Sequence, residues 1–269
     1  MDEVNKTLYI PLFGKSLVSK KGIILKDTKA EEIWEKEHFE LKCKSKSKWL
    51  AYFMAMRAKV FDDWLTALIS KSDSSTIILH IGCGMDSRIE RVGTHGHLWY
   101  DVDFEEVIAS RRKYYSENDF YHMITGDLRH KEWLKKVPGD TNAIIVLEGI
   151  SMYLTPQELA GSFSALEEHF SSVNILMDCY TEYAAKISKY KNPINDVGVT
   201  QTYGIDNPES LTEGTNFKYV TEHNMTPVHL INELKGTEKM FFKKVFAGSF
   251  SKKMYRIYEF ETCKDALHG

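Results

Sequence analysis

Short apolar runs alternate with helical patterns between residues 76 and 180. The runs, which are rich in β-branched and aromatic residues, are 76–81, 98–102, 120–124, 143–147 and 173–177. Unbroken runs of this length are typical of strands buried on both faces of a parallel sheet. Helical patterns occupy 104–115 and 156–170, the second with Thr155 as its expected N-cap. The alternation predicts an α/β fold with a doubly wound sheet, whose ligands bind beyond the carboxyl ends of the strands.

The residues on either side of this core follow other patterns. Apolar residues recur at spacings of three and four from 31 to 69, which predicts a helical cap over residues 1–70. Residues 181–225 are polar and rich in Asn, Thr and Tyr, which indicates a lid inserted into the same domain. The interval 226–269 predicts a closing helix that begins at 227 and reaches 234 or 242, and then an antiparallel strand over 252–260.

Composition narrows the function without naming it. The chain has 269 residues and a net charge of −3, which does not suggest a nucleic-acid partner. No apolar run approaches the roughly 20 residues that cross a membrane, and we expect no signal peptide. Four cysteines without a CxxC pair favour reduced thiols in a cytoplasmic protein. We expect no metal, because no cluster of His, Asp and Glu has ligand spacing.

Two glycines follow the first predicted strand directly. Gly82 and Gly84 enclose Cys83, and glycine lets a backbone pass close to a ligand without a Cβ clash. A dinucleotide fingerprint requires a third glycine at position 87, which is Ser87 here. A pyrophosphate cradle is therefore disfavoured, and a ligand without phosphates stays open.

Acidic residues end the next two strands. Asp103 lies about 20 residues after the glycine turn, the spacing at which a carboxylate accepts hydrogen bonds from a ribose. Asp101 is the alternative for this role, and either residue can instead cap the following helix. Asp127 and Leu128 follow the third strand and are candidates to contact an adenine, although Asp127 can equally be a simple turn residue.

Glu148 ends the fourth strand and precedes Gly149, at the expected switch point of the sheet. A buried carboxylate needs a partner, which the ammonium group of an amino-acid ligand or nearby backbone N–H groups can supply. His80 and His122 lie in or beside strands, and we interpret both as structural. No catalytic residue is assigned.

Five segments together resemble the leucine carboxyl methyltransferase family, and within it the O-methyltransferase subgroup of tetracenomycin polyketide synthesis. They are GCGMDSR at 82–88, WYDVDFEEVIASRR at 99–112, EGISMYL at 148–154, TLYIPLFGKSLVSKKGIILKDTKAEEI at 7–33 and MYRIYEFE at 254–261. The resemblance covers nearly the whole chain and is weakest over 181–235. Family members usually show GAGLDTR, so Cys83, Met85 and Ser87 are mild departures.

The resemblance implies a class I methyltransferase fold that binds S-adenosylmethionine and releases S-adenosylhomocysteine. It places Gly82 and Gly84 near the methionine part and Asp103 at the ribose. Asp127 and Leu128 would flank the adenine. It also assigns two residues to the amino-acid end of the cofactor, Glu148 and Arg57, and a guanidinium suits a carboxylate because it donates two parallel hydrogen bonds.

The expected function is O-methyl transfer to a small-molecule acceptor, either a carboxylate or a polyketide-like compound. A carboxylate is already ionised at neutral pH and needs no general base, whereas a phenol or alcohol does. Two alternatives stay open, namely methylation of a protein C-terminal carboxylate and a binding protein without catalytic activity. We expect the acceptor to be enclosed by residues 181–225 together with 9–21. The sequence leaves the acceptor and the oligomeric state open.

Overall fold

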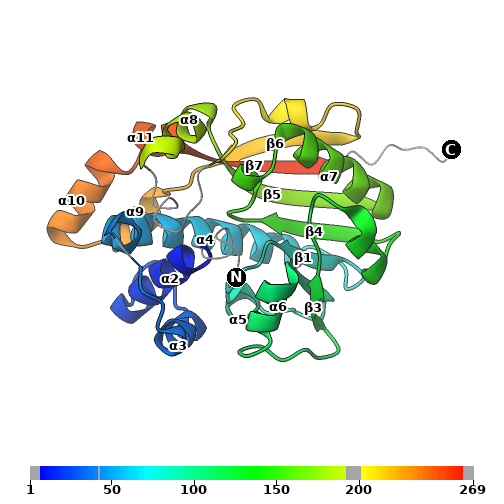
Figure 1. The fold of residues 1–269 in the computed structure, drawn as a ribbon, viewed down its shortest axis with the longest axis horizontal. Helices are drawn as coiled ribbons and strands as arrows, with labels where there is room; N and C mark the ends of the chain where they lie inside the picture. Colours follow the sequence, from blue (N-terminus) through cyan, green and yellow to red (C-terminus); the bar gives the residue numbers. More distant parts are fainter. Residues whose placement is uncertain (1–6, 42, 192–200, 263–269) are drawn as a thin grey trace.

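A computed structural model describes residues 7–41, 43–191 and 201–262. Seven strands form one sheet in the order β3-β2-β1-β4-β5-β7-β6 (Figure 1). The strands are β1 Ile77–Ile81, β2 Trp99–Asp103, β3 Tyr121–Thr125, β4 Asn142–Leu147, β5 Ser172–Tyr180, β6 Phe217–His223 and β7 Tyr255–Thr262. The first five are parallel, and β7 runs antiparallel between β5 and β6. The predicted doubly wound, mostly parallel sheet is confirmed.

Helices cover both faces of this sheet. The α-helices are α2 Tyr9–Lys21, α3 Thr28–Glu37, α4 Lys48–Ile69, α5 Arg88–Val92, α6 Glu105–Arg111, α7 Pro156–His169, α8 Glu182–Lys191, α9 Val228–Glu233, α10 Gly236–Val245 and α11 Ser249–Met254. Short 3-10 helices are η1 Cys43–Lys46, η2 Lys131–Lys136, η3 Ser151–Tyr153 and η5 Pro208–Leu211. Helix α7 starts with the expected cap, since Thr155 accepts a hydrogen bond from the Glu158 amide.

Alternate residues of the central strands enter two separate apolar cores. In β1, Ile78 joins a core with the N-terminal helices, while Ile77 and Leu79 join a second core with α7. Helix α4 therefore packs on one face of the sheet and α7 on the other (Figure 1). Burial on both faces explains why these strands appear in the sequence as unbroken apolar runs.

The structure refines two of the predicted patterns outside the core and contradicts the third. The pattern over 31–69 is split, because His38 ends α3 in a left-handed conformation with φ of 47°. The first of the two predicted ends of the helix from 227 is confirmed, because α9 ends at Glu233, and Leu234 and Lys235 are extended before α10 begins. The predicted lid over 181–225 includes β6, which pairs with β7 and forms an edge of the sheet.

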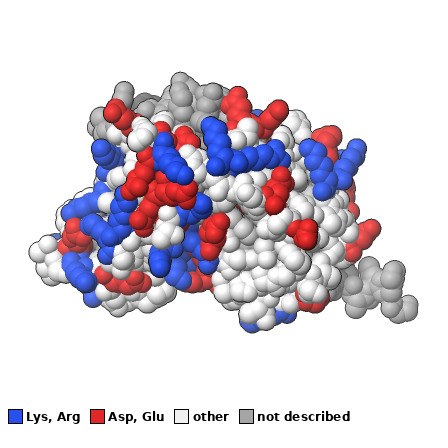
Figure 2. Space-filling view, turned by 90° about the horizontal axis from the view of Figure 1, so that it is seen from below, with Lys and Arg blue, Asp and Glu red and all other residues white. Residues whose placement is uncertain are grey.

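Charges of both signs are intermixed over the N-terminal helices on the lower face of the molecule (Figure 2). On α3, for example, Glu32 forms ion pairs with Lys29 and Lys36. No helix among the described residues is long and apolar enough to cross a membrane. Cys83 and Cys179 are buried free thiols, as expected.

Candidate active site

A cavity of about 720 Å³ lies at the carboxyl ends of the parallel strands. Its position matches the expected ligand site of a doubly wound sheet. The cavity is lined by all of the predicted site residues, which are Arg57, Gly82, Gly84, Asp103, Asp127, Leu128 and Glu148. The structure therefore brings together side chains that lie far apart in the sequence, although their individual roles stay predictions.

The glycine turn after β1 forms one wall of the cavity. Gly82 has φ of 69° and Gly84 has φ of 52°, both in the left-handed region that glycine adopts without strain. A Cβ on Gly82 would overlap the Ile150 side chain. Gly82 is therefore needed for its backbone conformation and for the packing of Ile150, in addition to the close approach of a ligand that the sequence suggests.

Asp103 connects the glycine turn to the next strand. One carboxylate oxygen accepts a hydrogen bond from the Gly84 amide at 2.7 Å, and the other accepts one from the Phe104 amide at 2.7 Å. Each oxygen keeps a lone pair beside the cavity. Burial raises the pKa of Asp103 to about 6, against the lowering effect of these two amides. Asp103 thus fixes the backbone at the start of α6 and still presents hydrogen-bond acceptors to the cavity.

Asp101 has a structural role instead. It does not line the cavity, and its carboxylate accepts hydrogen bonds from the Trp99 indole at 2.8 Å, the Tyr121 hydroxyl at 2.6 Å and the Arg111 guanidinium. Burial alone would raise the pKa of Asp101, but chiefly Arg111 lowers it to about 2. The alternative that Asp101 binds a ribose is therefore not supported.

Asp127 lies in the loop after β3, and its carboxylate accepts hydrogen bonds from another residue of that loop. Its oxygens accept hydrogen bonds from the Arg129 amide at 3.0 Å and the Arg129 Nη2 at 2.6 Å. The turn role that the sequence left open is therefore present. Asp127 nevertheless lines the cavity with Leu128, and the neighbouring wall is formed by Phe104 and Val107.

Arg57 reaches from α4 across the ends of two strands. Its Nε donates to Glu148 Oε1 at 2.9 Å, and its Nη1 donates to Asp178 Oδ2 at 2.8 Å. None of the hydrogen bonds among the described residues uses Nη2. That atom lies 3.3 Å from the position of a Cβ on Gly149, whose φ is 76°. A glycine at 149 therefore keeps the space beside Nη2 clear.

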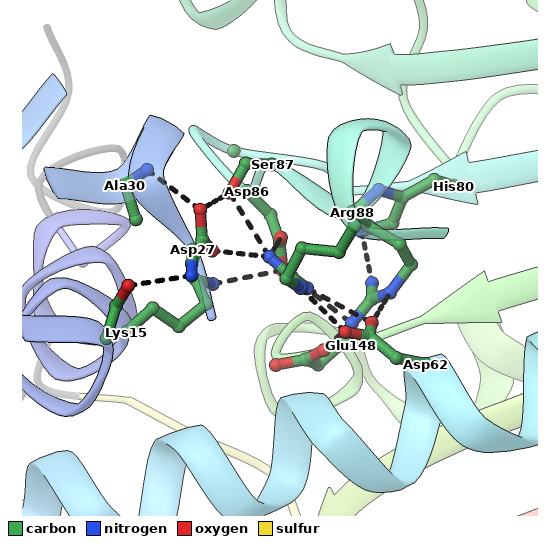
Figure 3. Close-up of polar contacts among 12 residues, drawn as sticks. Lys15, Asp27, Ala30, Asp62, His80, Asp86, Ser87, Arg88 and Glu148 are labelled. Carbon is green, nitrogen blue, oxygen red and sulfur yellow. Dashed lines mark hydrogen bonds and ion pairs between the residues drawn. The ribbon is translucent and has the colours of Figure 1, made fainter. Parts of the chain in front are cut away.

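A network of buried ion pairs continues from Glu148 to the N-terminal helices (Figure 3). Arg88 donates to Glu148, to Asp62 at 2.8 Å and to His80 Nε2 at 2.9 Å. Burial lowers the pKa of His80, which keeps this imidazole neutral. The arginines outweigh the effect of burial on Glu148, so its pKa falls to about 2. His80 also lines the cavity, so the interpretation of this residue as structural stays a prediction.

The far half of the network ties α2 to the start of α5. Arg91 bridges Asp62 at 2.6 Å, Asp27 at 2.6 Å and Asp86 at 2.9 Å. Lys15 completes it through Asp86 at 3.0 Å. The whole network has four cations against five carboxylates, which are Lys15, Arg57, Arg88, Arg91, Asp27, Asp62, Asp86, Glu148 and Asp178. With all of them ionised it carries one negative charge in excess, which favours a cationic ligand in the cavity.

Sequence reasoning missed most of this network. Arg88 is the last residue of the GCGMDSR segment at 82–88. The one sequence feature that could have identified it is a positive charge shortly after the glycine turn. Asp178 lies near the end of β5, as Glu148 follows β4, and both face Arg57. The position of a carboxylate at a strand end was therefore a usable signal for Asp178.

The cavity changes character along the sheet. Over β1–β3 it is lined by the glycine turn, Asp103 and Asp127, which we call the polar end. Over β5 and β7 it is lined by Tyr180 and Tyr255, whose rings lie 4.7 Å apart, and by Phe53 at 5.6 Å from Tyr255. We call this part the apolar end. Its other members are Ile10, Leu50, Met54, Met152, Ile187, Phe246, Phe250 and Met254.

Both predicted enclosing segments contribute to this cavity. Helix α2 supplies Ile10 and Lys15, and α8 supplies Ile187 and Ser188. A third contribution, from α10 and α11, was not expected. Among the described residues of the apolar end we find no imidazole, and burial raises the pKa of the Tyr153 phenol well above its ordinary value. His122 stacks on Tyr100 and does not line the cavity.

The described residues contain no group of three His, Cys, Asp or Glu side chains arranged to hold a metal ion.

Solved structures share this architecture. The chain superimposes on a methyltransferase of Thermobifida fusca with a TM-score of 0.57 and 14% identity, covering 87% of each chain. A magnesium protoporphyrin IX methyltransferase of Synechocystis, solved with S-adenosylhomocysteine, gives a TM-score of 0.53 and 12% identity over 87% of this chain and 94% of that one. The fold is therefore that of class I methyltransferases.

Sequence comparison narrows the class to a family. The leucine carboxyl methyltransferase family model matches residues 3–167, and the chain belongs to that family. It is 28% identical to the tetracenomycin polyketide synthesis O-methyltransferase TcmP of Streptomyces glaucescens, over 77% of each chain. It is 27% identical to the S-adenosyl-L-methionine-dependent methyltransferase dpfgK of Gibberella zeae, over 65% of this chain and 64% of the relative. The resemblance stated from the motifs is confirmed, and the protein is an S-adenosylmethionine-dependent methyltransferase.

Proposed function

We propose that this protein transfers a methyl group from S-adenosylmethionine to an oxygen atom of a small molecule with an apolar body, either a carboxylic acid or a polyketide-like compound. One observation carries the proposal. A single cavity joins the polar end, which has the donors and acceptors that the cofactor requires, to an aromatic apolar end with room for an acceptor.

The polar end has the right chemistry for the cofactor. Asp103 offers carboxylate lone pairs to two ribose hydroxyls, and Leu128 with Val107 gives the apolar walls that an adenine needs. The Arg57 guanidinium offers Nη2 to a carboxylate beside Gly149. Glu148 is held ionised for an ammonium group, and the excess negative charge of the network suits a sulfonium. The cofactor, when bound, supplies an electrophilic methyl group.

The protein's own residues contribute by position and by exclusion of water. The ion pairs of Arg57 and Arg88 fix Glu148 from two sides, so the amino-acid end of the cofactor meets a preorganised site. The ring cluster of Phe53, Tyr180 and Tyr255 excludes water from the apolar end, where a hydrated anionic nucleophile would react slowly. Because the described residues offer no general base there, an acceptor that is already ionised fits best.

The relatives support this direction without naming the acceptor. The Streptomyces relative is a tetracenomycin polyketide synthesis O-methyltransferase, and the two chains align over 77% of each. Membership of a methyltransferase family favours an enzyme over a protein that keeps only the fold. The match does not choose between a small molecule and a protein C-terminus as the acceptor.

A methyl-transfer screen tests the proposal. The protein is incubated with methyl-labelled S-adenosylmethionine and a panel of aromatic carboxylic acids, phenols and peptides that end in a free leucine carboxylate. We expect label on a small molecule, released by mild base if the product is an ester, and no label with Asp103→Ala. Label on the peptides alone would establish the alternative of a protein methyltransferase. Failure of the wild-type protein to bind S-adenosylhomocysteine in calorimetry would refute the cofactor assignment.

A further inference from the structure

Helices α10 and α11 present large apolar side chains to solvent. Met240 is 67% exposed, Phe241 45%, Val245 38% and Phe250 46%. These residues and the lysines among them, within 235–254, form what we call the α10–α11 surface. Helix α10 lies at the outer end of the molecule, away from the sheet (Figure 1). Exposed apolar side chains gathered in this way mark an interaction site more often than scattered single ones do.

The same surface is strongly basic. Residues 235–254 contain six lysines and one acidic residue, Glu238, so they carry a net charge of +5 in a chain whose total is −3. The rest of the chain therefore carries −8. This concentration contrasts with the N-terminal helices, where charges of both signs are intermixed (Figure 2).

Neighbouring residues do not neutralise these lysines. Glu238 is engaged by the N-terminal helices, where it pairs with Lys48 at 2.7 Å and with Lys21 at 3.7 Å and accepts a hydrogen bond from the Tyr52 hydroxyl at 2.7 Å. Within the described parts of the chain, no ion pair involves any of the six lysines of this surface. They are Lys235, Lys239, Lys243, Lys244, Lys252 and Lys253. Their charge is available to an external partner.

The exposed apolar side chains are continuous with the cavity. Phe241 packs on Trp49 at 4.6 Å between ring centroids, and Phe246 packs on Phe250 at 6.1 Å. Phe246 and Phe250 also line the apolar end of the cavity, as does Ile187, which is 37% exposed. The apolar wall of the cavity therefore reaches the outside of the molecule beside the basic α10–α11 surface.

We propose that the α10–α11 surface binds an anionic lipid membrane, with its phenylalanines and Met240 in the acyl boundary and its lysines at the phosphates. Amphipathic helices with aromatic and lysine side chains lie in such interfaces, and each lysine strengthens the attraction. The apolar end of the cavity then faces the bilayer, so an acceptor dissolved there reaches it without crossing water. This last step rests on the proposed function, whereas membrane binding itself does not.

Other occupants fit the surface less well. A second copy of the chain would place two surfaces of charge +5 against each other, which disfavours a symmetric dimer through α10–α11. An acidic protein would need a complementary shape for side chains that protrude from the outer end of the molecule. A fluid bilayer accepts protruding side chains without any prior match, and the long lysine stems reach its phosphates.

Vesicle sedimentation tests this assignment. The full chain is mixed with vesicles of phosphatidylcholine alone or of phosphatidylcholine with phosphatidylserine, and the bound fraction is measured. We expect binding only to the anionic vesicles and its loss at high salt. Lys243→Glu with Lys244→Glu should lower the partition coefficient by roughly 25-fold or more, because each lysine near an anionic surface contributes about fivefold. Phe241→Ser should lower it by about tenfold or more.

Matched variants elsewhere separate this surface from general effects. Lys113→Glu with Lys135→Glu reverses two exposed lysines, and Phe120→Ser removes a ring that is 47% exposed, all outside α10 and α11. These variants should change the partition coefficient by less than the α10 variants change it. Equal losses in both sets, or no preference of the wild-type protein for anionic vesicles, would overturn the proposal. Binding to soluble polyglutamate but not to vesicles would overturn it too, in favour of an acidic protein partner.

Failure of the membrane proposal and failure of the proposed function give different results in the two binding measurements. A protein that binds S-adenosylhomocysteine normally but ignores the vesicles refutes only the membrane surface. A protein that sediments with the vesicles but does not bind S-adenosylhomocysteine refutes only the proposed function.

Discussion

The polar end of the cavity is made from turns that directly follow strands of the parallel sheet, whereas the apolar end is made mainly from helices outside it. Ile81 of β1 pairs with Val102 of β2 and with Leu147 of β4, so the sheet register fixes where Gly82, Asp103 and Glu148 must lie. No comparable register fixes Phe53 of α4 against Phe250 of α11, since the two side chains come from separate helices.

Because of this difference, we expect the two ends of the cavity to tolerate substitutions differently. At the polar end and at Arg57, side chains are held by buried charges and backbone conformation, so a substitution there should cost stability as well as cofactor binding. At the apolar end, contacts are non-directional, and substitutions of similar volume should mainly change which acceptor fits. The predictions below test that separation, from the largest expected effect to the smallest.

Arg57→Met should give the largest effect, because it leaves Glu148 and Asp178 without the cation that they share. Breaking a buried ion pair by removing one partner costs about 3–5 kcal/mol. Urea unfolding of the variant measures this loss, and adding Asp178→Asn should recover part of it. As a control, Lys131→Met removes an ion pair with Glu168 between exposed side chains and should cost less than about 1 kcal/mol. Similar losses of unfolding free energy in Arg57→Met and Lys131→Met would contradict the claim that buried charges stabilise the polar end of the cavity.

Asp103→Ala should weaken cofactor binding by about 1.5–3 kcal/mol, the usual contribution of hydrogen bonds to a charged group. Calorimetric titration with S-adenosylhomocysteine measures the change. Asp63→Ala, which removes an exposed carboxylate paired with Lys59, should leave the affinity unchanged. An unchanged affinity in Asp103→Ala would rule out the ribose assignment.

Cofactor affinity should also fall as the pH falls through about 6, because Asp103 must be ionised to accept two hydroxyl hydrogen bonds and burial raises its pKa to about 6. The folded protein then holds a proton that the unfolded chain, with an ordinary pKa of 3.8, releases. Asp103 therefore destabilises the fold above about pH 6, and this penalty disappears as the pH falls toward 3.8. Glu148 acts in the opposite sense, since its pKa of about 2 gives stability above 4.5 that is lost toward 2.

Titrations with S-adenosylhomocysteine from about pH 8 to about pH 5 measure the effect, which is at most about tenfold per pH unit. Asp103→Asn should abolish the dependence. A dependence that persists in that variant would assign it to another group.

Ile187→Trp should have the smallest effect on the fold. Ile187 is 37% exposed and lines the apolar end, so a larger side chain should narrow the entrance for an acceptor while stability changes by about 0.5 kcal/mol or less. Acceptor KM is expected to rise, with S-adenosylhomocysteine affinity unchanged within about twofold. Val220→Trp, at a position 42% exposed on β6, is the matched control. Loss of cofactor affinity in Ile187→Trp would show that the two ends are not separable.

The sequence predicted the polar end because its signals are local. A buried strand followed by Gly82, or ended by Asp103, is visible in a few adjacent letters, and the order of strands in a doubly wound sheet then brings these positions together. Glu148 was placed at this edge of the sheet for the same reason, whereas the ion pairs that it forms with Arg57 and Arg88 were not expected.

The rest depends on pairings that local patterns do not encode. Arg88 finds Asp62 and Glu148 only after α4, α5 and β4 have packed together. The predicted lid was wrong over β6 because this polar edge strand buries only one of its seven residues and resembles a loop in the sequence. The sequence left the end of the helix from 227 open between 234 and 242, because apolar residues recur on both sides of Leu234.

The ion pair between Arg57 and Asp178 has a consequence for how the chain is made. The two residues are separated by 121 positions, so the ribosome releases α4 long before the second counter-ion of Arg57 exists. Translation proceeds at about 5–20 residues per second. For several seconds the nascent helix therefore carries an arginine that lacks this counter-ion. The ion pairs around the methyltransferase site are complete only after β5 has been synthesised.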